Sequence, residues 1–226
     1  MSGYKGIIFD MDGTMVDNMM VHHRAWQRKL AELGLELSLE EVKEKIHGIN
    51  EEILERIFGD RFTVEERRQI SYEKEAAYRE IFLPELRLIP GLDAFLEKAK
   101  TAGIPMAIGT AAPTENVDFV LDQLNLRAYF SGVFDAKSVS KGKPDPEIFE
   151  KAAASLQLSA AECLIFEDSL TGADAARRAG ARAVIVTTTH AQSEFKNFDH
   201  IIRFIPHYEG IEPGDFTHFK NNKSAG

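Results

Sequence analysis

Cysteine is almost absent from this chain. Cys163 is the single one among 226 residues, so an internal disulfide is excluded, and its apolar neighbours predict a packed core thiol. No apolar run approaches the roughly 20 residues that cross a bilayer, which argues against a membrane span. Basic residues are in the minority, because 27 Lys and Arg face 36 Asp and Glu, giving a formal net charge of −9. A nucleic-acid surface needs clustered basic residues, so no nucleic-acid partner is expected.

The amino terminus also lacks the basic-then-apolar pattern of a secretion signal. What is there is ordinary for a globular protein: 44% of the residues are hydrophobic and 28% are charged. This composition fills a core and keeps the surface polar. We therefore expect a soluble cytoplasmic protein, built as one large domain or as a core domain with a smaller insert.

Residues 18–82 have a helical and highly charged pattern. Ser38 and Thr63 are each followed three residues later by Glu, which is the capping-box pattern that begins a helix. Glycines at positions 34, 48 and 59 fall where helices should end. The segment therefore predicts about four helices, without a convincing strand, in one compact helical unit.

After Pro90-Gly91 the pattern changes to alternating helices and strands. Thr114 is expected to cap one helix, and Pro146 to take the first helical position of another. Such alternation predicts parallel βαβ units, so the helical unit is an insertion after the first strand. The apolar runs predict buried strands at residues 7–9, 104–109, 163–166, 183–186 and, as a last strand, 200–204.

The end of the first predicted strand carries two acids. Asp10 follows the apolar residues 7–9, and Asp12 comes two residues later, on the same side if the backbone stays extended. Gly13 then allows a sharp turn. Desolvated carboxylates are costly, so two of them at this point favour a role in holding a divalent cation and attacking phosphorus.

Three further strand ends carry suitable groups. They are Thr110, Lys143 in Lys141-Gly142-Lys143-Pro144, and the pair Glu167-Asp168. Each alone has a plain alternative: Thr110 as a helix cap, Lys143 as a solvated surface charge, and the acidic pair as a cap of the next helix. Because ligands bind beyond the carboxyl ends of parallel strands, the groups together predict one site.

In combination these motifs resemble the haloacid dehalogenase superfamily of phosphotransferases, and within it the β-phosphoglucomutase-like branch. The residues that carry the resemblance are Asp10–Asp17 (Asp-Met-Asp-Gly-Thr-Met-Val-Asp), Thr110, Gly142–Pro146 and Phe166–Gly172. The resemblance implies an α/β fold, with a doubly wound, Rossmann-like parallel-sheet core over residues 1–17 and 87–226. It also implies an α-helical cap domain inserted over residues 18–86.

The resemblance assigns a role to each motif residue. Asp10 would be the nucleophile that forms an aspartyl-phosphate, and Asp12 the general acid and then the base that activates water. Thr110, the Ala111 amide and Lys143 would hold the remaining phosphate oxygens. Uncatalysed hydrolysis of a phosphate monoester is extremely slow. A covalent carboxyl intermediate, with cations on the phosphoryl oxygens, is chemistry that can accelerate it.

The resemblance also implies a magnesium ion. Its ligands would be the Asp10 carboxylate, the Asp12 backbone carbonyl and Asp168, with Glu167 as a ligand or as a partner behind the ligands. Magnesium prefers oxygen ligands, and the predicted site offers nothing softer.

Three cap residues bear on the substrate. By the resemblance, His22 matches a His that helps gate the acid/base residue, and Lys74 matches a cap Lys; the alternatives are an exposed helix His and a surface charge. The mutase pattern has an Arg for the distal phosphate where aligning His47–Glu51 puts Glu51, which would repel a second phosphate. Ala112 also stands where the mutase pattern has a hydroxyl.

The expected function is therefore a magnesium-dependent phosphatase acting on a small, sugar-like phosphorylated metabolite. One alternative is a β-phosphoglucomutase-type isomerase, and another is a non-catalytic phosphometabolite-binding module, against which the five key side chains argue. A monomer is expected by analogy with the family. No role is evident for residues 206–226, which include His207, Tyr208 and His218; surface packing is the simpler account, and a frayed tail is expected over 220–226.

Overall fold

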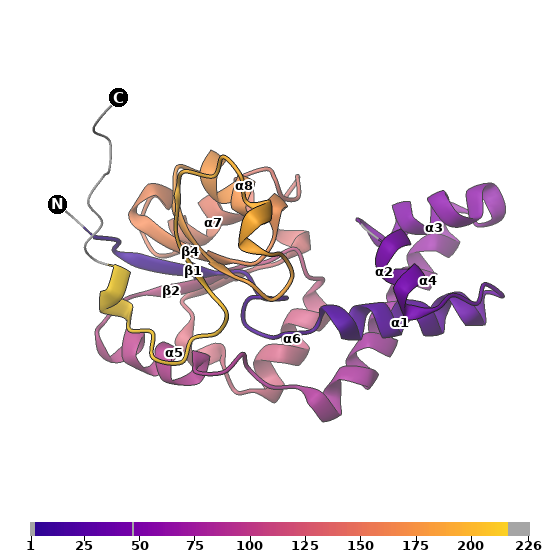
Figure 1. The fold of residues 1–226 in the computed structure, drawn as a ribbon, viewed down its shortest axis with the longest axis horizontal. Helices are drawn as coiled ribbons and strands as arrows, with labels where there is room; N and C mark the ends of the chain where they lie inside the picture. Colours follow the sequence, from indigo (N-terminus) through magenta and orange to yellow (C-terminus); the bar gives the residue numbers. More distant parts are fainter. Residues whose placement is uncertain (1–2, 47, 217–226) are drawn as a thin grey trace. The chain divides into compact units, whose positions relative to one another are not determined.

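The computed structural model describes residues 3–46 and 48–216. The chain divides into two compact units, one formed by Met1–Asp17 with Arg87–Gly226 and the other by Asn18–Leu86. Within the described residues, the first unit contains all the strands and the second is helical (Figure 1). The expected tail at 220–226 lies outside the described residues.

The first unit is built on a six-stranded sheet in the order β3-β2-β1-β4-β5-β6, with every neighbouring pair parallel. The predicted strands are all present, and one was missed. That strand, β3, has three half-buried residues, too few to show a hydrophobic pattern. The bounds are β1 Gly6–Phe9, β2 Met106–Gly109, β3 Gly132–Phe134, β4 Cys163–Glu167, β5 Arg182–Val186 and β6 Ile201–Ile205.

Helices cover both faces of this sheet, so the prediction of a doubly wound α/β core is confirmed. Figure 1 shows α7 (Glu147–Ser155) and α8 (Leu170–Arg178) on one face, with α5 (Leu92–Thr101) and α6 (Thr114–Gln123) on the other. Short 3-10 turns complete the unit at Arg127–Tyr129, Ala136–Ser138, Ala160–Glu162, Gln192–Glu194 and Pro213–Phe216.

Two helix starts differ from the prediction by one residue. Pro113 is the N-cap of α6, and Thr114 is its first residue, with its hydroxyl donating to the Asp135 carboxylate instead of capping the helix. The ionised acceptor makes this a strong hydrogen bond. Pro146 is the N-cap of α7 and not its first residue.

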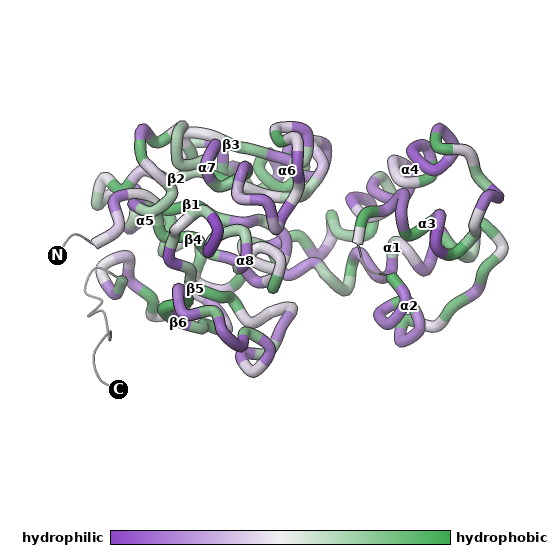
Figure 2. The backbone as a smooth tube through the Cα atoms, turned by 90° about the horizontal axis from the view of Figure 1, so that it is seen from above, coloured by the Kyte–Doolittle hydropathy of each residue, from purple (hydrophilic) through white to green (hydrophobic). Residues whose placement is uncertain are grey.

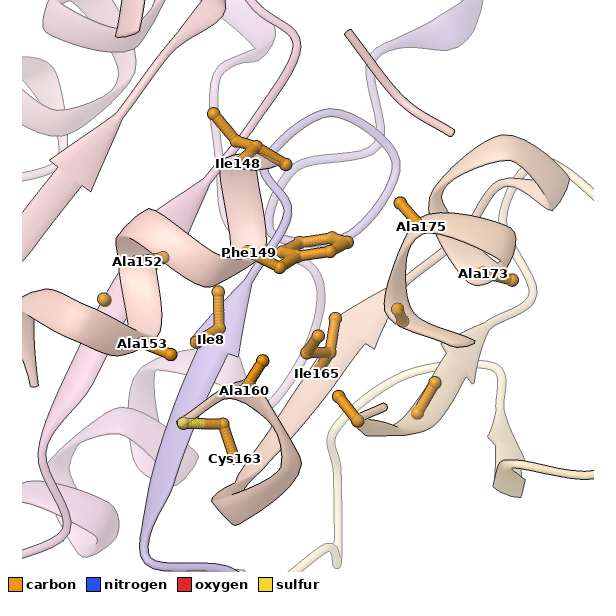
Figure 3. Packing of buried hydrophobic residues seen from close by; sticks show 14 of the residues in the cluster. Ile8, Ile148, Phe149, Ala152, Ala153, Ala160, Cys163, Ile165, Ala173 and Ala175 are labelled. Atoms are coloured by element: carbon orange, nitrogen blue, oxygen red, sulfur yellow. The ribbon is translucent and has the colours of Figure 1, made fainter. Parts of the chain in front are cut away.

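The core between the sheet and α7 and α8 is tightly packed. Figure 3 shows Phe149 of α7 over Ile8 of β1 and Ile165 of β4, all three almost fully buried. Cys163 belongs to the same cluster and is 2% exposed, so the predicted packed thiol is confirmed. Burial, followed by the nearby charge of Glu162, raises the pKa of the Cys163 thiol to about 12, so it stays uncharged and inert.

The second unit consists of four α-helices in the described residues: α1 Met19–Glu32, α2 Leu39–Lys45, α3 Asn50–Phe58 and α4 Val64–Phe82. Short 3-10 turns follow at Gly59–Arg61 and Leu83–Glu85. Both predicted capping boxes form, at Ser38 and Thr63. Figure 2 shows hydrophobic and hydrophilic residues alternating along these helices, as in surface helices with one buried face. Over the described ranges, each helix of the chain is too short or too polar to span a membrane.

Candidate active site

The candidate site starts at the carboxyl ends of the central strands. Phe9, the last residue of β1, pairs with Ile108 of β2 on one side and with Phe166 of β4 on the other. The Asp10 backbone amide then donates to the Phe166 carbonyl at 2.9 Å, which continues the ladder by one residue. The residues that follow these strands therefore emerge side by side at one edge of the sheet.

A tight turn follows Asp10 and carries Asp12. The Gly13 amide donates to the Val16 carbonyl at 2.8 Å, and Asp12 and Val16 form an isolated bridge. Gly13 has φ = 76°, and a Cβ there would overlap the Asp168 carboxylate, so the turn requires glycine for both reasons. Asp12 is half-buried in this turn.

Three acidic side chains converge at this edge. Asp10, Glu167 and Asp168 are 5%, 1% and 4% exposed, and each brings a carboxylate oxygen within 4.8 Å of the other two. Lys143 enters from the loop before α7, and its Nζ lies 2.6 Å from Asp10 Oδ1 and 2.6 Å from Glu167 Oε1. The surface position considered for Lys143 is wrong, because its side chain is 6% exposed.

Burial dominates the electrostatics of this cluster. It raises the pKa of Asp10 to about 7, although Lys143 opposes the shift. Burial also raises the pKa of Asp168, with the charges of Glu167 and Asp10 adding to the effect. Burial alone would lower the pKa of Lys143, but the facing carboxylates raise it overall, so its ammonium stays charged. One ammonium does not balance three carboxylates, so the donor set suits an added divalent cation.

These shifts make the metal-free protein sensitive to pH. A folded Asp10 with a pKa of about 7 holds a proton that the unfolded chain releases above about pH 4. The folded state therefore binds more protons than the unfolded state across that window. As a consequence, this group lowers the free energy of unfolding as the pH rises from about 4 to about 7.

The buried ammonium leads to a first prediction, for Lys143→Met. Removing it leaves two buried carboxylates without their counter-charge, so the free energy of unfolding in EDTA at pH 7.5 should fall by about 3–5 kcal/mol. The loss should be smaller at pH 5, because Asp10, whose pKa is about 7, then takes up a proton. Urea denaturation at the two pH values measures both effects.

Lys151→Met is the matched control for that experiment. Lys151 lies on α7 and forms an exposed ion pair with Glu147 at 2.7 Å, so its loss should leave stability nearly unchanged. Equal denaturation midpoints for Lys143→Met and Lys151→Met would contradict the compensating role of Lys143.

Glu167 is occupied on both of its oxygens. Oε1 accepts from Lys143, while Oε2 accepts from the backbone amides of Asp168 and Ser169, each at 2.8 Å, and from the Ser169 hydroxyl at 3.0 Å. Both predicted roles of Glu167, as a metal ligand and as a partner behind the ligands, are compatible with its position in the cluster. Its contacts orient Lys143 and the two residues that precede α8.

Thr110 and Ala111 follow β2, the strand next to β1. The Thr110 amide donates to the Phe134 carbonyl at 2.9 Å, and its hydroxyl oxygen accepts from the Ala112 amide at 3.2 Å. Thr110 is 1% exposed and Ala111 is exposed. The accepting hydroxyl still carries its own hydrogen, which is a donor at the same sheet edge.

Two threonines of the site were not predicted from the sequence. The Thr189 hydroxyl donates to Asp168 Oδ2, and the Thr188 hydroxyl donates to the Gly13 carbonyl. Both follow β5, so their signal was available as a run of hydroxyl residues just after a predicted strand. Their contacts orient the Asp168 carboxylate and the turn after Asp10.

In the helical unit, His22 and Lys74 lie together. Lys74 Nζ is 3.0 Å from His22 Nδ1 and donates to Glu75 Oε1 at 2.8 Å. His22 stacks on Tyr78 at a ring distance of 4.0 Å. The side chain of Lys74 is 3% exposed, so the surface charge considered for it is wrong. Glu75 also accepts from Asn50 at 2.7 Å.

The Glu75 carboxylate faces the Lys74 ammonium in this group. Burial alone would raise the pKa of Glu75, but Lys74 and His22 lower it to about 2, so the Glu75 carboxylate is ionised beside the Lys74 ammonium. Glu51 is half-buried in the first turn of α3. His47, used in the alignment that located Glu51, lies outside the described residues.

Comparison with known proteins gives a consistent result. Residues 4–180 match the family model of the haloacid dehalogenase-like hydrolases. The chain is 33% identical over 188 residues to Beta-phosphoglucomutase of Bacillus subtilis (strain 168), covering 80% of this chain and 82% of that protein. It is 32% identical over 183 residues to Fructose-1-phosphate phosphatase YqaB of Escherichia coli (strain K12), covering 81% and 96%.

A solved structure agrees with these relatives. The HAD hydrolase, family IA, variant 3, from Entamoeba histolytica has a TM-score of 0.85 and 25% identity, covering 94% of this chain and 97% of that one. The relatives in sequence include a mutase and a phosphatase, so their names do not decide between the two reactions.

Proposed function

The chain belongs to the haloacid dehalogenase-like hydrolases and is an enzyme of that type, and we propose that it hydrolyses small, sugar-like phosphate monoesters through a phosphorylated Asp10. The observation that carries the proposal is the buried cluster in which Lys143 lies 2.6 Å from the Asp10 carboxylate. An ammonium so placed screens a carboxylate against the negative charge of an approaching phosphate.

The proposed reaction has two displacements. In the first, an Asp10 oxygen bonds to phosphorus, the ester P–O bond breaks, and Asp12 gives its proton to the departing alkoxide. In the second, a water oxygen bonds to phosphorus while Asp12 takes the water's proton, and the bond to Asp10 breaks to release inorganic phosphate. Lys143 and the Thr110 hydroxyl would hold the phosphoryl oxygens through both steps.

A magnesium ion would be held by Asp10, Asp168 and the backbone carbonyl of Asp12, with Glu167 orienting Lys143 behind them. When bound, the ion supplies positive charge to the phosphoryl oxygens. The excess of carboxylates over cations in the buried cluster supports this assignment.

Proton release on metal binding is a second prediction. Ligand carboxylates must be ionised, and the pKa of Asp10 in the metal-free protein is about 7, so binding of magnesium at pH 6.5 should release on the order of one proton. Calorimetric titration in two buffers with different ionisation enthalpies measures this number. The same heat in both buffers would contradict the assignment, and Asp168→Asn should weaken the binding itself.

Hydrolysis is preferred to isomerisation because of the helical unit. A mutase holds a sugar bisphosphate by both phosphates, yet Glu51 stands where the mutase pattern has an Arg, and the Lys74 ammonium is paired with Glu75 at 2.8 Å. Two carboxylates in these positions would weaken the binding of a second phosphate. These charges favour a substrate that carries a single phosphate group.

The deciding assay uses β-glucose 1-phosphate with magnesium and a catalytic amount of glucose bisphosphate. Inorganic phosphate without glucose 6-phosphate is the expected product. Accumulation of glucose 6-phosphate would replace the proposal by the mutase reaction. A phosphate-release screen over sugar, polyol and nucleotide esters then identifies the preferred leaving group.

A further inference from the structure

The described C-terminal segment, residues 206–216, follows β6 and lies beyond residues 4–180, which match the family model. It packs against the chain that leads into α5. The Tyr208 amide donates to the Pro90 carbonyl at 2.8 Å. Gly91 has φ = 83°, and a Cβ there would overlap the backbone of Tyr208 and Glu209. The expectation of surface packing is therefore wrong for Tyr208, which is buried, whereas His207 is half-buried and His218 lies outside the described residues.

Tyr208 is almost fully buried in this contact, with 1% exposure. Its ring packs on Phe95 of α5 at 5.6 Å and on Phe166 of β4 at 5.5 Å, and lies 6.5 Å from Phe9 of β1. Phe9 directly precedes Asp10, and Phe166 directly precedes Glu167. The ring thus packs under the strand ends that carry the acidic cluster.

The Tyr208 hydroxyl reaches the turn after Asp10. It donates to the Thr14 carbonyl at 3.0 Å, across 194 positions in the sequence. On the other side, the Ile89 amide donates to the Met15 carbonyl at 2.9 Å. The turn that carries Asp12 is therefore held at two successive carbonyls by chain that comes much later.

The hydroxyl is suited to this contact because it stays neutral. Burial raises the pKa of Tyr208 well above its usual value, and the negative charges of Asp10 and Asp168 add to the shift. The O–H therefore remains a hydrogen-bond donor at neutral pH.

From these contacts we propose that Tyr208 is a positioning residue, whose hydroxyl holds the Thr14 carbonyl and thereby fixes the turn that presents Asp12 beside Asp10. Its effect on catalysis rests on the proposed function, while its effect on the turn does not. A small displacement of a reacting group costs a large factor in rate, so the contact acts on the chemical step.

Tyr208→Phe tests the proposal, because it removes the hydroxyl and keeps the ring. We expect kcat to fall about tenfold, the value of one hydrogen bond, with KM unchanged. We also expect faster amide hydrogen exchange in residues 11–16, measured by mass spectrometry on the metal-free protein, where Met15 and Gly13 amides are bonded within the turn.

Tyr4→Phe is the matched control. The Tyr4 hydroxyl donates to the Pro213 carbonyl at 2.5 Å, so this variant also loses a tyrosine hydroxyl bonded to a backbone carbonyl, but away from the turn at residues 11–16. It should leave kcat and exchange in residues 11–16 unchanged. Equal losses of kcat in the two variants, or unchanged exchange in Tyr208→Phe, would overturn the proposal. If the unaltered protein released no phosphate, the proposed function would fail, and the exchange comparison would still decide the role of Tyr208.

Discussion

Asp10→Asn is expected to lower phosphate release by about 10⁵-fold or more, because an amide oxygen is a poor nucleophile and cannot carry the phosphoryl group. The variant should fold, because asparagine has nearly the same shape as aspartate. The substitution also removes one of three clustered carboxylates and so reduces their mutual repulsion. Its stability at pH 7.5 should equal or exceed that of the unaltered protein, because the cost of ionising buried Asp10 is removed.

The measurement is release of inorganic phosphate from an aryl phosphate at saturating magnesium. Asp93→Asn is the control, because Asp93 is an exposed residue of α5 and should retain full activity. Turnover above a tenth of the normal rate in Asp10→Asn would mean that Asp10 is not the residue that accepts the phosphoryl group. A beryllium fluoride adduct on another residue would lead to the same conclusion.

Asp12→Asn is expected to lower turnover by about 10³-fold, with an effect that depends on the leaving group. An aryl phosphate with a good leaving group needs no proton to depart, so the first displacement should continue. The second displacement lacks its base, and the phosphorylated enzyme should accumulate. Rapid mixing should therefore show a burst of one equivalent of aryl alcohol followed by slow release of phosphate. An alkyl phosphate should show no burst.

The control for that experiment is Asp17→Asn. Asp17 belongs to the same run of residues, but it is exposed, whereas Asp12 is half-buried in the turn. Normal turnover of an alkyl phosphate by Asp12→Asn would exclude a role in proton transfer. Intact-protein mass spectrometry after quenching in acid identifies the phosphorylated species directly.

The motif residues were predictable because their signals are local. The apolar run before Asp10, the turn allowed by Gly13 and the acids after β4 are each contained in a few neighbouring residues. The missed features had weaker signals. The strand β3 has three residues, too few for a hydrophobic period, and the run of hydroxyl residues after β5 does not by itself show that Thr189 contacts Asp168, across 21 positions.

The sequence by itself determined the alternation of helices and strands, the helical insertion and the order of acids at strand ends, because hydrophobic period and turn residues act between near neighbours. Only the tertiary structure decided which charges are buried. Lys143 meets Asp10 across 133 positions, Lys74 is enclosed in the helical unit, and Tyr208 lies beneath the turn it contacts. Burial depends on what the whole fold packs around a side chain, and the surrounding dielectric then sets its pKa and its chemistry.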